Sequence, residues 1–253
     1  MIRSIALAGA LFACGPAAGQ SESRHALVIG NAAYEAPDAS LRNAVRDARN
    51  VGAALGRAGF QVVILEDADH ATMRQAIRAF EDKLRSDPGV SFVYFAGHGL
   101  QLAGRNYLMP VGAGLVSERE VTARTVDAGE LVERLRATGA RLNIIVLDAC
   151  RNNPLYKPVF VMRGAPNAGL AKVNPARGTV VAFATEPGRV ATDGAGNEGV
   201  YAKYLVQYMG VPGLPLEQVF KRVREAVVAE TKGVQVPVEF NMLTGDEFYF
   251  VQR

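Results

Sequence analysis

Two residues that can carry out nucleophilic chemistry follow two apolar stretches of this 253-residue chain. His98 comes directly after the run SFVYFAG, and Cys150 comes directly after the run LNIIVLDA. A cysteine attacks a carbonyl carbon as the thiolate, and a nearby imidazole can take up and return its proton. If the two runs are neighbouring parallel strands, both residues emerge at the same edge of the sheet. The pair therefore predicts a catalytic dyad.

Each member of this pair also has a structural interpretation. His98 could be a hydrogen-bonded histidine in a turn, and Cys150 could be a small buried hydrophobic residue. Their joint placement at the ends of two predicted core strands favours the chemical interpretation. Gly99 lacks a Cβ, so its N–H can approach a substrate carbonyl. We expect the amides of Gly99 and Cys150 to form an oxyanion hole.

The rest of the chain alternates apolar runs of strand length with segments of helical period. We expect strands over His25–Ile29, Gln61–Leu65, Ser91–Ala96, Leu142–Leu147, Thr179–Ala184 and Glu247–Val251. We expect helices over Ser40–Arg57, Ala71–Leu84, Asp127–Ala137, Tyr201–Met209 and Leu216–Lys232, and a β-hairpin within Leu100–Val111. This order predicts an α/β fold with a mainly parallel sheet covered by helices on both faces.

The composition fits a folded domain and excludes several classes of function. Hydrophobic residues make up 49% of the chain and charged residues 21%, so disorder is not expected. The net charge of +3 is spread along the chain, so charge indicates neither nucleic-acid binding nor binding to an anionic membrane surface. Three histidines and two cysteines suit neither a zinc site nor a disulfide framework. Nucleotide-binding glycine motifs are also missing.

The first 19 residues have the pattern of a secretory signal peptide. Arg3 precedes the apolar segment Ile5–Ala13, which is too short to span a bilayer, and small residues follow. We therefore expect an exported protein, periplasmic or secreted. In an alternative interpretation, residues 11–14 (LFAC) resemble a lipobox, and lipidation of Cys14 would anchor the chain to a membrane. A buried N-terminal strand or helix is a third interpretation.

The two reactive motifs resemble those of a known family. YFAGHG at 94–99 and VLDAC at 146–150 are similar to the histidine and cysteine motifs of the caspase-like cysteine peptidases (clan CD, family C14). This group includes caspases, metacaspases and bacterial orthocaspases. Animal caspases carry Q-A-C-[RQG]-G at the nucleophile. Here Asp148 replaces the Gln and Arg151 follows the cysteine, which is closer to the metacaspase and bacterial branches.

The resemblance also covers the opening RHALVIGN and implies a caspase-like three-layer α/β/α sandwich with a mainly parallel central sheet. It divides the chain into a p20-like caspase domain at 24–154, a linker loop at 155–177 and a p10-like part at 178–253 that completes the same sheet. The linker is rich in Pro, Gly and Asn and has no sustained period. Its basic residues could be sites of self-cleavage, although basic loop residues are usually only solvated: Lys157, Arg163, Lys172 and Arg177.

Charge near the nucleophile predicts a substrate preference. Asp148 lies two residues before Cys150, and Asp47, within LRNAVRDA, matches a second pocket carboxylate of metacaspases by the same resemblance. Two carboxylates in a partly desolvated pocket favour a cationic P1 side chain, and the planar arginine fork can pair with a carboxylate through two hydrogen bonds. In the alternative interpretation, Asp47 is a solvated helix residue and Asp148 is a structural cap.

These observations together predict a cysteine endopeptidase that cleaves protein or peptide substrates after Arg or Lys. Calcium activation is known among metacaspases, but Leu100–Gly114 contains no Asp or Glu, and no acidic cluster has calcium-ligand spacing. We therefore expect no obligatory metal and no cofactor. The alternative function is a caspase-like pseudoenzyme or scaffold that binds a protein partner without cleavage. The sequence leaves the oligomeric state open.

Overall fold

The computed structural model describes residues 22–35, 40–115, 117–150, 175, 177–186 and 196–253. The signal peptide predicted at 1–19 lies outside these residues, as does most of the linker predicted at 155–177. Within the described ranges, none of the helices combines the length and the apolar character needed to cross a membrane.

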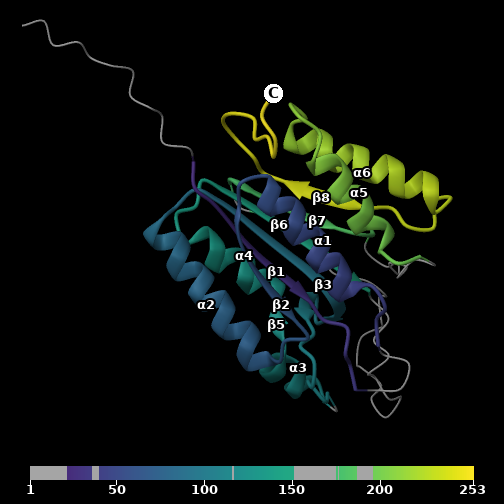
Figure 1. Ribbon diagram of the computed structural model, residues 1–253. Helices are drawn as coiled ribbons and strands as arrows, with labels where there is room; N and C mark the ends of the chain where they lie inside the picture. The colour runs from purple at the N-terminus through teal and green to yellow at the C-terminus, as the bar shows by residue number, and fades with distance from the viewer. Residues whose placement is uncertain (1–21, 36–39, 116, 151–174, 176, 187–195) are drawn as a thin grey trace, which may run out of the picture.

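One mixed sheet runs through the centre of the molecule (Figure 1). Its main path has the strand order β2-β1-β3-β6-β7-β8, and along this path the pairing of the edge strand β8 with β7 is antiparallel while the others are parallel. This order confirms the predicted mainly parallel sheet. The strands are β1 (Arg24–Gly30), β2 (Gln61–Glu66), β3 (Val90–Leu102), β6 (Leu142–Cys150), β7 (Thr179–Phe183) and β8 (Val238–Asn241).

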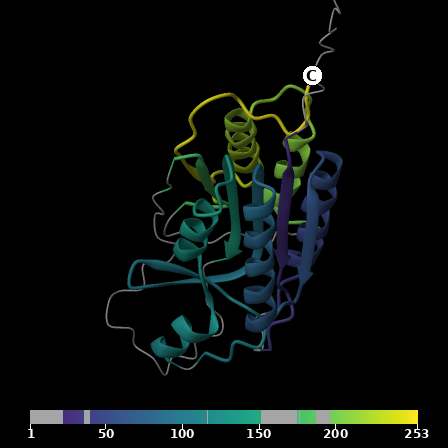
Figure 2. The same ribbon diagram turned by 90° about the vertical axis from the view of Figure 1, so that its left-hand side faces the viewer.

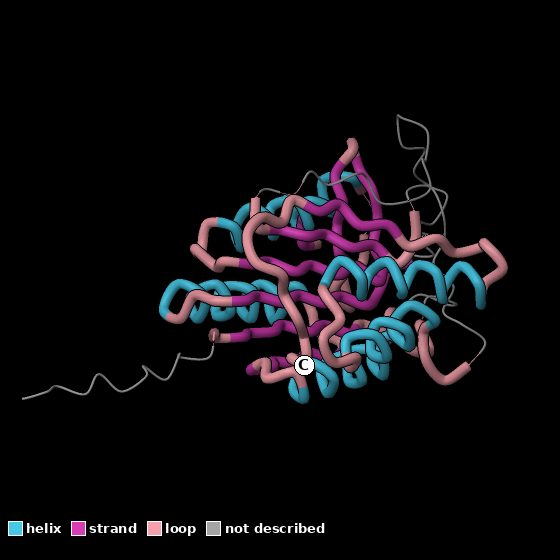
Figure 3. The backbone as a smooth tube through the Cα atoms, turned by 90° about the horizontal axis from the view of Figure 1, so that it is seen from above, coloured by secondary structure: helices cyan, strands magenta, loops and turns pink. Residues whose placement is uncertain are grey.

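Helices cover both faces of this sheet, as Figures 1 and 3 show. One face packs against α1 (Ala44–Arg57), α5 (Val200–Met209) and α6 (Leu216–Glu230). The opposite face packs against α2 (His70–Ser86) and α4 (Ala128–Arg136). The arrangement confirms the predicted three-layer α/β/α sandwich.

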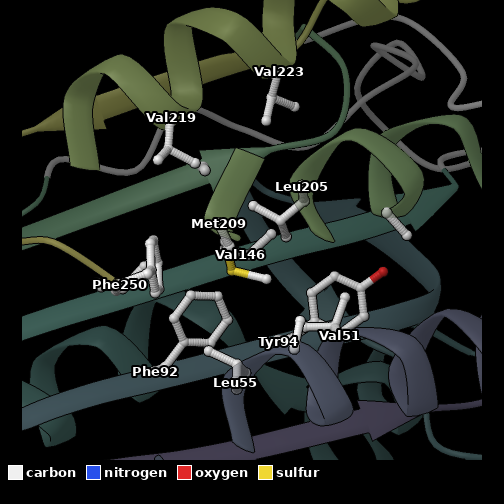
Figure 4. Close-up of a cluster of buried hydrophobic side chains, with 14 of the residues drawn as sticks. Val51, Leu55, Phe92, Tyr94, Val146, Leu205, Met209, Val219, Val223 and Phe250 are labelled. Atoms are coloured by element: carbon white, nitrogen blue, oxygen red, sulfur yellow. The ribbon is translucent and has the colours of Figure 1, made fainter. Parts of the chain in front are cut away.

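The central strands are mainly apolar because each has a helical layer on either side. All residues of β3 from Val90 to Leu100 are buried. Figure 4 shows the layer beneath α1, α5 and α6, where the rings of Phe92 and Tyr94 from β3 lie among aliphatic side chains of the helices. Full burial of a side chain of this size contributes roughly 1.5–3 kcal/mol to stability. This burial fixes which face each strand residue occupies.

Polar residues at the predicted helix starts act as caps. The Asp127 carboxylate accepts hydrogen bonds from the N–H groups of Gly129 (2.8 Å) and Glu130 (3.0 Å) at the start of α4. The short helix α3 (Glu118–Arg124) is absent from the sequence prediction. It begins with Ser117, whose hydroxyl accepts from the N–H of Glu120. Ser117 and Glu120 form the Ser-x-x-Glu pattern of a capping box, so the start of this helix could have been predicted from the sequence.

Strand β3 continues beyond the Gly-His-Gly segment at which the sequence pattern predicts its end. Its parallel pairing with β6 stops at His98, but the strand runs on to Leu102 and turns through Ala103-Gly104, both at positive φ. The predicted hairpin is confirmed, and it extends to one side of the main sheet (Figure 2). The predicted strand end was wrong because a second partner supplies backbone hydrogen bonds there. The partners are β4 (Arg105–Leu108) and, beyond it, β5 (Val126–Asp127).

The predicted last strand, Glu247–Val251, is also wrong. This segment forms only an isolated bridge between Tyr249 and Pro215, and β8 provides the edge strand instead. Phe248 and Phe250 are both buried and pack edge-to-face against each other. The alternation of buried and more exposed residues in this segment therefore results from the burial of two aromatic rings and not from strand pairing.

Arg24, the first residue of β1, joins the beginning of the described chain to its end. Its guanidinium donates to the carbonyl oxygens of Ala58 (2.8 Å), Phe250 (2.8 Å) and Tyr249 (3.1 Å). The same group lies 4.9 Å from the centroid of the Phe248 ring. Three acceptors and an aromatic ring suit the planar arginine fork, and a lysine ammonium could not reach them all at once.

We expect Arg24→Lys to lower the free energy of unfolding by about 2 kcal/mol, because buried carbonyl groups lose charged donors. Urea denaturation of the variant beside Arg78→Lys, at an exposed position of α2, measures this cost. The two variants keep the same net charge. Equal stability of the two would show that the contacts of Arg24 do not hold the C-terminal segment.

Candidate active site

The parallel pairing of β3 with β6 ends at His98 and Cys150 and brings their backbones together. In the parallel register between these strands, the two residues are direct partners. Neighbouring strands lie about 4.8 Å apart, so the predicted dyad satisfies the condition that its two strands are adjacent. The His98 side chain is 4% exposed. The side chain of Cys150 lies outside the described part of the structure.

The N–H of Gly99, a predicted member of the oxyanion hole, faces strand β6. Successive residues of a strand direct their N–H and C=O groups to alternate sides. Ala96 and His98 direct theirs toward β1 and β4, because the carbonyl of Ala96 accepts from Asn31 and that of His98 from Met109, both at 2.9 Å. The N–H of Gly99 therefore points to the opposite side, toward the ladder with β6, and the oxyanion hole stays a prediction.

The Asp148 carboxylate is held in place by a buried tyrosine. The Tyr94 hydroxyl donates to Oδ2 of Asp148 at 2.9 Å. Burial, followed by the negative charges of Asp148 and Asp47, raises the pKa of Tyr94 well above its usual value. Tyr94 therefore stays protonated and remains a donor, while Asp148 is itself half-buried and can still meet a ligand.

Asp47 is not the solvated residue of the alternative interpretation. It is 4% exposed, and both carboxylate oxygens accept from the N–H of Gly199, at 2.9 and 3.1 Å. Gly199 is the N-cap residue of α5, so a negative charge lies at the positive end of that helix. A Cβ at Gly199 would lie 2.5 Å from Oδ2 of Asp47, so this close approach requires glycine.

Tyr94 is influenced by both carboxylates that the sequence predicts for the substrate pocket. It donates a hydrogen bond to Asp148, and the charges of Asp148 and Asp47 both raise the pKa of its hydroxyl. Tyr201 of α5 is also fully buried, and burial followed by the charge of Asp148 raises its pKa well above normal. The sequence prediction missed both tyrosines. Tyr94 could have been found, because it precedes His98 by four residues on one strand and so shares its face.

The two remaining predictions for this site concern metals and cofactors. Among the described side chains, no group of three or more His, Cys, Asp or Glu residues is arranged to hold a metal ion. The expectation that the reaction needs no metal stays a prediction.

Two mammalian proteins are similar in sequence to about half of the chain. The human mucosa-associated lymphoid tissue lymphoma translocation protein 1 (Homo sapiens) is 32% identical to the chain over 138 residues, which are 54% of the chain and 16% of that protein. Its Mus musculus homologue is 31% identical over 138 residues, with the same coverage. The chain thus matches only a small part of the length of these relatives.

A solved structure and a family model extend the likeness over nearly the whole chain. The structure of pro-Sf-caspase-1 superposes with a TM-score of 0.63 at 15% identity and covers 92% of both chains, which shows a shared fold. The family model described as the caspase domain, peptidase family C14, matches residues 23–249. Peptidases of this kind act on protein substrates. The predicted resemblance is therefore confirmed, and the chain belongs to the caspase-domain family of cysteine peptidases.

Proposed function

We propose that the protein is an active cysteine endopeptidase that hydrolyses peptide bonds after Arg or Lys through a His98–Cys150 dyad. The observation that carries this proposal is the parallel register, which makes these residues partners at the end of the pairing between β3 and β6. Membership of a peptidase family supports the reaction type. The two carboxylates around Tyr94 support the preference for a cationic side chain.

The dyad performs the reaction in two steps. The Cys150 thiolate attacks the scissile carbonyl carbon, and the carbonyl π electrons move to the oxygen, which accepts from the N–H groups of Gly99 and Cys150. The C–N bond then breaks as the His98 imidazolium gives its proton to the leaving amine, and a thioester remains. His98 next takes a proton from water as the water attacks the thioester. The products are a carboxylic acid and the restored cysteine.

The two carboxylates have different tasks in the pocket. Asp148 is half-buried and has one oxygen held by Tyr94, so we assign it the direct contact with the substrate guanidinium or ammonium. Asp47 is buried and bonded to the start of α5, so it supplies a fixed negative charge behind that contact. A charge-assisted hydrogen bond of this kind is roughly twice as strong as a neutral one.

Digestion of a peptide library tests the reaction. Wild type is expected to cleave after Arg and Lys, and both Cys150→Ala and His98→Ala are expected to lose all but residual activity. EDTA is expected to leave the wild-type rate unchanged, since no acidic calcium-ligand cluster follows the histidine motif. Cleavage after Asp would refute the pocket assignment.

Alkylation by iodoacetamide separates the endopeptidase from the pseudoenzyme alternative. A working dyad is expected to react rapidly at Cys150 and slowly in His98→Ala, because His98 stabilises the thiolate. A protein that is not labelled and cuts no peptide would be a binding protein of the caspase fold.

Substitution of Asp148 by Asn tests the direct contact. The variant keeps an oxygen for the Tyr94 hydroxyl but loses the charge, so kcat/KM for an Arg peptide is expected to fall about 10- to 100-fold. A citrulline peptide has nearly the same shape without the charge, and its slow cleavage should change little. Asp82→Asn, at an exposed position of α2, is the matched control. An equal loss for both peptides would rule out charge recognition by Asp148.

Replacement of Asp47 by Ala tests its buried contact with Gly199. Loss of the acceptor of this N–H is expected to lower the free energy of unfolding by about 1–2 kcal/mol, as measured by urea denaturation. Asp82→Ala removes an exposed aspartate instead and is expected to change stability by less. A fully stable Asp47→Ala protein would show that the contact with Gly199 does not stabilise the fold.

A further inference from the structure

Tyr34 lies against the proposed catalytic histidine. It follows β1 in the chain and is buried, with its ring centroid 4.4 Å from that of His98 and the two ring planes inclined by 50°. Aromatic rings at this separation are in contact. One side of the imidazole therefore packs against the tyrosine ring, which restricts rotation of the histidine side chain.

The Tyr34 hydroxyl also occupies a position within the backbone ladder of the β3–β4 hairpin. The N–H of Met109 donates directly to the carbonyl of His98 at 2.9 Å. In a regular antiparallel pair, the N–H of His98 would donate in return to the carbonyl of Met109. Here it donates to the Tyr34 hydroxyl at 2.9 Å, and this hydroxyl donates onward to Met109 at 3.0 Å. The hydroxyl thus bridges the two strands at the histidine itself.

The segment that carries Tyr34 is fixed from two directions. The Asn31 side chain is fully buried, donates to the carbonyl of Met109 at 3.0 Å and accepts from the N–H of Ala68 at 2.9 Å. The Asp67 carboxylate accepts from the two amides that precede the tyrosine, at 2.7 and 2.8 Å. Tyr34 is therefore held by bonds on both sides of β1 and not by its own packing alone.

Gly97, the residue before His98, leaves room for the Tyr34 hydroxyl. A Cβ at Gly97 would lie 2.7 Å from the Tyr34 hydroxyl oxygen and 2.8 Å from a ring carbon of Phe95. Both distances are shorter than real Cβ contacts, so only glycine lets the hydroxyl reach the His98 amide. The glycine of the motif therefore has a physical reason that is separate from the chemistry of the nucleophile.

We propose that Tyr34 is a positioning residue for His98 in the peptidase reaction. The inference rests on the proposed function, since it assigns a task within that site. The hydroxyl fixes the histidine backbone at the end of the parallel sheet, and the ring fixes the direction of the imidazole. The π face of the ring also favours the imidazolium that accompanies a cysteine thiolate.

Two substitutions separate these effects. Tyr34→Phe keeps the ring and removes both hydrogen bonds, so kcat for an Arg peptide is expected to fall about tenfold while KM stays within about twofold, because orientation of a reacting group acts on the chemical step. Tyr34→Leu removes the ring as well, and the pH midpoint of Cys150 alkylation is expected to rise by about 0.5 units. Tyr107→Phe, at another buried tyrosine of the same cluster, is expected to change neither quantity.

The alkylation is measured in a Cys14→Ala background, so that Cys150 is the sole thiol. A kcat for Tyr34→Phe within twofold of wild type overturns the backbone role. An unchanged alkylation midpoint in Tyr34→Leu overturns the ring's role. If Tyr34→Leu does not fold, the alkylation profile of Tyr34→Phe beside Tyr107→Phe decides whether the tyrosine acts on the histidine at all.

The same measurements keep this inference distinct from the proposed function. A wild-type protein that cuts no peptide refutes the peptidase proposal. Its alkylation profile still shows whether Tyr34 controls the pairing of histidine and thiol, because alkylation needs no substrate. His98→Ala provides the reference in which that pairing is lost.

Discussion

The parallel register between β3 and β6 is the constraint on which the site depends. A slip of one residue would pair His98 with Ala149 and move every side chain of one strand to the opposite face. Burial on both faces opposes such a slip. A polar pair at the amino ends of the strands opposes it as well, since the buried hydroxyl of Ser91 donates to the side-chain oxygen of Asn143 at 2.6 Å. A mispaired register would leave these groups without partners in an apolar layer, which costs free energy.

Within that register, tyrosines from different parts of the chain contact the two groups to which the proposed function assigns tasks. Tyr94 holds the carboxylate assigned to the substrate, and Tyr34 contacts the histidine assigned to the proton. Both are buried, so their hydroxyl groups do not exchange partners with water. Orientation set before the substrate arrives lowers the entropic cost of the chemical step.

Most of the fold could be predicted because the central strands are buried on both faces and so appear as continuous apolar runs. The pairing of His98 with Cys150 in the sheet could be predicted because the two residues end two such runs. The end of β3 could not be predicted, since the hairpin that extends this strand depends on pairing in a second sheet. Glu247–Val251 was wrongly predicted as a strand because its two buried phenylalanines are spaced two residues apart, which is also the period of a strand. The contact between Tyr34 and His98 could not be predicted, because the two residues lie far apart in the chain.

The position of Asp47 shows why charge near a nucleophile is hard to interpret from sequence. The same carboxylate bonds to the N–H of Gly199, just before α5, and its charge raises the pKa of the Tyr94 hydroxyl. The Asp47 carboxylate already accepts hydrogen bonds on both oxygens, so it attracts a cation through its electrostatic field more than by direct contact. The half-buried Asp148 can attract a cation in both ways. In the proposed pocket both carboxylates would attract a cationic substrate side chain, and Asp148 alone would contact it. A pocket built in this way would select a cation in general before it selects the shape of arginine.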